Sequence, residues 1–104
     1  MGRKKHIEYL REFKKEIKKK ITLQKMILFG SRAWGKPRKE SDFDMLIVSP
    51  DFKGKDTLVR GREFYKVWNL NYPVDFLCYT PEEFKKLKKQ ATIAQMAVKK
   101  GKEI

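Results

Sequence analysis

Apolar residues recur at helical spacing near the start of the chain. Within residues 4–20, Ile7, Leu10, Phe13 and Ile17 are three or four positions apart, and Lys, Arg and Glu fill most positions between them. This spacing places the apolar side chains on one face of a helix. The chain is therefore predicted to begin with an amphipathic helix that packs on a core through one face.

Three short apolar runs follow, and each has the length of a strand. They cover residues 25–29, 43–48 and 74–79, with the sequences KMILF, FDMLIV and VDFLCY. The first run ends at Gly30, where the backbone is expected to turn sharply. Residues 31–34 are predicted to form one helical turn, and residues 35–41 a basic loop with Pro37 at its centre.

Further helices are predicted in the second half of the chain. Asp56 is expected to cap a helix whose apolar positions are Leu58, Val59, Phe64, Val67 and Trp68. Residues 80–83 place Thr at the N-cap, Pro at N1 and Glu at N3 of a helix that runs to about residue 89. A last helix is predicted over residues 91–99, with Gly101 ending it and an edge-strand fragment after it. Strands that alternate with helices predict an α/β sheet layered with helices, in one domain over residues 1–104.

Candidate chemistry lies between the first two strands. Gly30 and Ser31 follow the first strand, and ten residues later Asp42-Phe43-Asp44 opens the second. A Gly-Ser turn can present backbone N–H groups and a hydroxyl to a phosphate. The guanidinium of Arg32, or that of Arg38 in the loop, is suited to phosphate oxygens. Gly30, Ser31 and Arg32 are therefore candidate nucleotide-binding residues.

Acidic residues at two neighbouring strands suggest a metal site. Asp42 and Asp44 are two positions apart, so they share one face of a strand. Asp75 lies in the third strand and can approach Asp44 if the two strands pair. Repulsion among three carboxylates would be relieved by divalent cations. Each aspartate alone could be a strand cap or an exposed residue, and Asp51 and Asp56 are rival acids in loops.

The spacing of Gly-Ser, ten residues and Asp-x-Asp resembles the nucleotidyltransferase superfamily of DNA polymerase beta, over nearly the whole chain. The short length is similar to minimal nucleotidyltransferases, many of which are antitoxins paired with a HEPN-domain toxin. The resemblance implies a nucleotidyltransferase fold with a small mixed sheet of three to four strands flanked by helices. It also implies ATP as substrate, two Mg²⁺ ions, and Asp42, Asp44 and Asp75 as the catalytic and metal-binding residues.

The resemblance leads to one expected activity and two alternatives. The expected activity is transfer of AMP from ATP to a hydroxyl of a partner protein, which would neutralise a HEPN toxin. The first alternative is an antitoxin of the same fold that acts by binding alone. The second is a basic nucleic-acid-binding protein, which is not favoured because no helix-turn-helix, zinc or RNA-recognition signature is found.

The charge is the strongest compositional signal. Lys and Arg total 26 against 13 Asp and Glu, which gives a formal net charge of +13. Such a field attracts phosphates, nucleic acid or an acidic protein, but a lysine-rich surface is also common in heat-adapted proteins. No signal-peptide pattern or membrane-length apolar run is found, so a cytoplasmic protein is expected. Cys78 is predicted to be a core residue, and the single histidine, His6, a surface residue.

Overall fold

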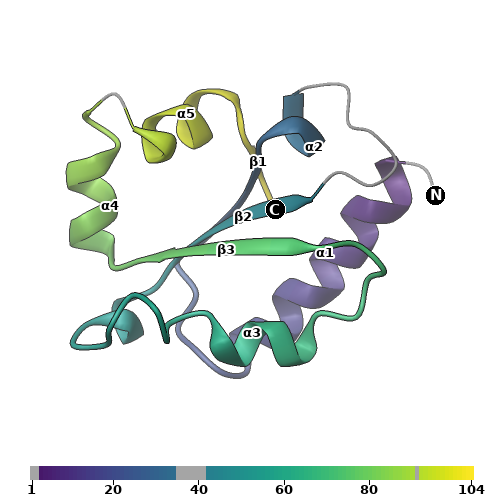
Figure 1. Cartoon of the computed structure of the whole chain (residues 1–104), viewed down its shortest axis with the longest axis horizontal. Helices are drawn as coiled ribbons and strands as arrows, with labels where there is room; N and C mark the ends of the chain where they lie inside the picture. Colours follow the sequence, from purple (N-terminus) through teal and green to yellow (C-terminus); the bar gives the residue numbers. More distant parts are fainter. Residues whose placement is uncertain (1–2, 35–41, 91) are drawn as a thin grey trace.

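The computed structural model describes residues 3–34, 42–90 and 92–104. It contains a four-stranded mixed sheet with helices on both faces, as the sequence predicted (Figure 1). The strands are β1 (Lys25–Phe29), β2 (Phe43–Val48), β3 (Val74–Tyr79) and β4 (Lys102–Glu103), in the order β3-β2-β1-β4. β2 pairs with β1 antiparallel and with β3 parallel, and β4 extends the sheet antiparallel to β1.

One face of the sheet is covered by α1 (Arg3–Lys18) and α3 (Arg62–Val67). The predicted stripe of α1 is buried, since Leu10 and Ile17 have no exposed surface. These side chains pack against alternate residues of the strands, including Met26, Met45 and Cys78. The alternate residues of the strands and the residues spaced three or four apart in α1 therefore form one core.

The other face is covered by α4 (Pro81–Leu87) and α5 (Ile93–Lys100). Phe84 of α4 and Ala97 of α5 pack on Leu46 and Val48 of the sheet. The predicted capping box is present, because the Thr80 and Glu83 side chains each accept a hydrogen bond from the other residue's backbone N–H. This second core covers only part of the sheet, and the start of β2 extends beyond it.

The prediction of a helix that begins after Asp56 is wrong for the first half of that helix. Residues 57–61 form turns, and α3 begins only at Arg62. The Asp56 side chain accepts a hydrogen bond from the N–H of Leu58 at 2.9 Å, which stabilises a turn in place of a helix. Leu58 is 84% exposed and Val59 37%, so neither contributes to the core as expected.

Two smaller findings complete the fold. No helix in the described part of the chain has the length and apolar character needed to cross a bilayer. The predicted basic loop, residues 35–41 with Arg38, lies outside the described residues.

Candidate active site

The two strand aspartates meet at one end of the sheet. Asp44 is the second residue of β2, Asp75 is the second residue of β3, and the parallel register pairs them directly. Both point to the face that carries α4 and α5, because their neighbours Phe43 and Val74 are buried against the opposite core. Asp42 is exposed and immediately precedes β2. The expected pairing of the strands is thus confirmed, and it places the aspartates of β2 and β3 side by side.

Gly30 lies directly after β1 and packs against the side chain of Asp44. It follows Phe29, which pairs with Asp44, and it has a φ of +76°. A Cβ atom at this position would lie 3.3 Å from Cγ of Asp44 and closer still to its Oδ2. The turn therefore requires glycine at this position for two reasons. The backbone conformation favours glycine, and a Cβ would enter the space that the Asp44 carboxylate occupies. The helix α2 (Ser31–Trp34) begins directly after it.

The electrostatics of this end are unfavourable to the ionised carboxylates. The pKa of Asp44 is raised, chiefly by burial and further by the negative charges of Asp75 and Asp42. A bound cation would offset the repulsion among the carboxylates and compensate for the lost hydration of Asp44, and carboxylate oxygens are ligands that suit Mg²⁺. Among residues 3–34, 42–90 and 92–104, no group of three or more acidic, His or Cys side chains is already arranged as a metal cage. Asp42 and Asp75 are exposed, so their side chains have room to turn toward an ion beside Asp44.

Arg32 has a different environment from the one predicted. Its guanidinium carbon lies 4.7 Å from the ring centre of Phe43 and 4.6 Å from that of Tyr72, which is cation–π geometry. Phe43 belongs to the core beneath α1, whereas Asp44 points to the other face. The Arg32 head group is thus held by aromatic rings next to the site, and its contact with a triphosphate stays a prediction.

The prediction that His6 lies on the surface is wrong. It is 8% exposed, and its ring packs edge-on against Phe43 and Tyr72 at 5.3 and 5.4 Å between ring centres. Its Nε2 atom is buried without a hydrogen-bond partner. Burial, followed by the charge of Arg32, lowers the pKa of His6. His6 was misjudged because it lies among basic residues in the sequence, although it precedes the buried Ile7.

Residues 10–99 of the chain match the sequence model of the nucleotidyltransferase domain. This match covers most of the chain and includes the Gly-Ser turn and all three aspartates. The chain belongs to the nucleotidyltransferase domain family. The carboxylate cluster therefore lies in a domain whose family carries out nucleotidyl transfer.

The fold agrees with this membership. A crystal structure from Sulfolobus solfataricus, provisionally assigned as a nucleotidyltransferase, aligns with a TM-score of 0.66 and 24% sequence identity. The alignment covers 81% of this chain and 75% of the other, and at this identity it shows the fold alone. A search of curated proteins gave no significant match.

This nucleotidyltransferase domain has a second charged cluster that was not predicted from the sequence. Arg60 is 9% exposed, and its guanidinium donates to Glu83 and, at 3.2 Å, to the carbonyl oxygen of Cys78. The same Glu83 belongs to the capping box of α4. The available signal was the Glu at N3 of a predicted helix, whereas nothing local indicated that Arg60 would be its partner. This cluster supports β3 from the end opposite Asp75.

Proposed function

We propose that this protein transfers AMP from ATP to a hydroxyl group of a partner protein, in the cytoplasm, as the antitoxin of a HEPN-domain toxin. The observation that carries the proposal is the direct pairing of Asp44 with Asp75 beside Gly30. Family membership supports nucleotidyl transfer in general. The nucleotide, the acceptor and the partner rest on the resemblance of the motif to minimal nucleotidyltransferases.

The chemistry is an exchange of one phosphorus–oxygen bond for another. The acceptor hydroxyl loses its proton to water, its oxygen forms a bond to the α-phosphorus, the bond from that phosphorus to the bridging oxygen breaks, and pyrophosphate leaves. Asp42, Asp44 and Asp75 would hold Mg²⁺, which when bound supplies charge stabilisation to the triphosphate and activates the acceptor oxygen. Gly30 leaves room for the Asp44 carboxylate, and the backbone N–H groups that follow it would donate to phosphate oxygens.

The test is incubation of the full chain with a HEPN-domain partner, Mg²⁺ and ATP labelled at the α-phosphate. The partner is expected to gain label from α-labelled ATP and none from γ-labelled ATP, which separates nucleotidyl transfer from phosphorylation. Asp44→Asn should abolish the transfer. Asp56→Asn removes the same charge from an exposed turn, so it is the matched control and should transfer normally.

Two results would count against the proposal. Neutralisation of the toxin by Asp44→Asn as well as by the parent would show that binding alone suffices. Absence of labelling together with absence of ATP binding would remove the enzymatic role altogether.

A further inference from the structure

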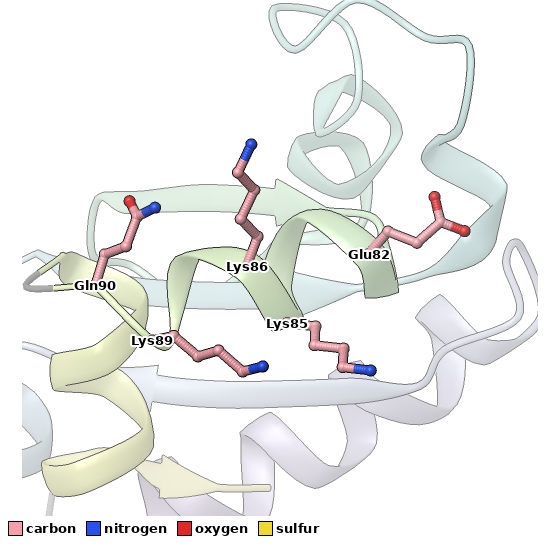
Figure 2. Close-up of a pocket in the computed structure, with 5 residues that line it drawn as sticks. All are labelled: Glu82, Lys85, Lys86, Lys89 and Gln90. Atoms are coloured by element: carbon pink, nitrogen blue, oxygen red, sulfur yellow. The ribbon is translucent and has the colours of Figure 1, made fainter.

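The outward face of α4 and of the turn after it carries a stripe of lysines. Residues 82, 85, 86, 89 and 90 follow one another along α4 and the turn after it, and all are exposed. They line a shallow hollow of about 420 Å³, formed by Glu82, Lys85, Lys86, Lys89 and Gln90. Figure 2 shows the Lys85 and Lys89 side chains extending in the same direction and Lys86 pointing to the other side. We call Lys85, Lys86 and Lys89 the α4 lysines.

The α4 lysines have no acidic partner in the part of the chain that the structure describes, in contrast to three exposed lysines on other surfaces of the protein. These three lysines lie on α1, directly after α1 and on α3, and each forms an ion pair with a Glu three residues earlier. These pairs are Lys15–Glu12, Lys19–Glu16 and Lys66–Glu63. On α4 the corresponding acid, Glu83, is bound to Arg60. Only Glu82, at the helix start, opposes the three positive charges of this face.

The chemistry of the hollow favours one class of partner. Its lining has no aromatic or large aliphatic side chain, so it lacks the apolar anchors that dominate protein–protein interfaces. It also offers no ring on which a base could stack. Exposed lysines without acidic partners instead match a row of phosphates, in a chain whose net charge is +13. We propose that the α4 lysines bind the phosphate backbone of a nucleic acid, without reading its sequence.

This surface is separate from the aspartates. Asp75 is the second residue of β3, and α4 begins two residues after Tyr79, the last residue of that strand. Four strand residues span about 13 Å, so the α4 lysines and the Asp44–Asp75 pair lie at opposite ends of the sheet (Figure 1). Nucleic-acid binding is therefore expected to need neither ATP nor Asp44. The inference goes beyond the proposed transfer reaction and does not depend on it.

The test measures binding by fluorescence anisotropy. The full chain is titrated into a labelled 20-nucleotide single-stranded RNA, and separately into a 20-base-pair DNA duplex, over a series of NaCl concentrations. The triple variant Lys85→Gln, Lys86→Gln and Lys89→Gln is compared with Lys15→Gln, Lys19→Gln and Lys66→Gln. Both variants lower the net charge from +13 to +10, so overall charge is matched, and they differ in which surface loses charge and in whether the removed lysines are paired with Glu.

The α4 variant is expected to bind at least about tenfold more weakly at 100 mM NaCl. Its slope of log affinity against log salt should be shallower by about 2 to 3, since each phosphate contact contributes roughly 0.7 to 0.9. The control variant should lose less than about threefold. Glu82→Gln should strengthen binding, because it removes the one opposing charge, and Asp44→Asn should bind like the parent. Thermal melting by circular dichroism verifies that each variant is folded.

Several results would overturn the inference. If both triple variants weaken binding equally, the effect belongs to overall charge and not to this face. Absence of binding by the parent at 50 mM NaCl would contradict it directly. If the α4 variant binds nucleic acid normally but no longer associates with an acidic protein partner, the face belongs to that protein instead.

Discussion

A carboxylate lies beside each end of β3, that of Glu83 on α4 at one end and that of Asp44 on β2 at the other, and the surroundings of the two groups are opposite in character. At one end, Glu83 accepts hydrogen bonds from Arg60 and from the backbone of Thr80, and these bonds lower its pKa. At the other end, burial and two like charges raise the pKa of Asp44. The negative charge of Glu83 is paired with Arg60 of the same chain. The negative charge of Asp44 would instead be stabilised by a cation bound from solution.

This difference separates a structural cluster from a functional one. A satisfied ion pair holds α4 to β3 and adds rigidity. An unrelieved group of acids costs stability in the free protein, and such costs are typical of sites that bind a ligand or perform chemistry. Substitutions at the two ends should therefore have opposite effects on stability and activity.

The largest effect is expected for Asp44→Asn. Nucleotidyl transfer should fall by on the order of 10³-fold, since a charged group that stabilises the reacting phosphates is lost. Stability without metal should rise at pH 7. Because the fold raises the pKa of Asp44, its contribution is favourable below the ordinary carboxyl pKa and is lost as pH rises through the folded value. Initial rates and thermal melts in EDTA measure the two quantities, and a marked loss of stability would contradict the comparison.

Arg60→Met should have the converse effect. It removes the hydrogen bonds that Arg60 donates to Glu83 and to the carbonyl oxygen of Cys78, while Glu83 keeps its bond from the backbone of Thr80. Breaking a buried pair costs about 3–5 kcal/mol, but the Glu83 side chain is 41% exposed and water replaces part of the interaction. We expect a loss of about 2 kcal/mol in denaturant unfolding, with normal activity per folded molecule.

Lys66→Met is the control for the Arg60 end. Its ion pair with Glu63 is exposed on both sides, so its removal should cost less than about 0.5 kcal/mol. Equal losses for the two variants would mean that the Arg60 cluster has no special structural role.

The next largest effect is expected for Gly30→Ala, which should reduce both stability and transfer activity. Gly30 and Gly54 have nearly the same φ, +76° and +78°, but only at Gly30 would a Cβ contact another residue, Asp44. Gly54→Ala should therefore cost only the backbone strain, about 1–2 kcal/mol. Gly30→Ala should cost this strain and also displace the carboxylate, with at least a tenfold loss of transfer. Equal activity of the two variants would show that close packing on Asp44 is unimportant.

The sequence was sufficient for the features that depend on local pattern. The buried stripe of α1, the three apolar strands and the capping box of α4 each have a signal within a few residues. The proximity of Asp44 and Asp75 could be expected from the sequence, because each is the second residue of its strand and the parallel register of β2 and β3 aligns these positions.

The features that the sequence did not predict depend on contacts between distant residues. Arg60 is buried because Glu83 and the Cys78 carbonyl, about twenty residues away, meet its guanidinium. Residues 57–61 form turns, the first of which is stabilised by the Asp56 side chain, so the apolar positions Leu58 and Val59 do not continue a helix. His6 is buried because the ring of Tyr72, which is distant in the sequence, packs against it.

The smallest effect is expected for His6, which lies at the Asp44 end on the opposite face of the sheet. The fold lowers its pKa through burial and the Arg32 charge, so its contribution to stability is present above the ordinary histidine value of about 6.5. That contribution is lost as pH falls through the folded value. Melting temperature should therefore decline from pH 7.5 to 5.5, and His6→Phe should reduce the decline. The Asp44 carboxyl shifts stability in the opposite direction, so both proteins are compared in the Asp44→Asn background. Because His6 is the only histidine, an unchanged decline in His6→Phe would show that the buried imidazole is not its source.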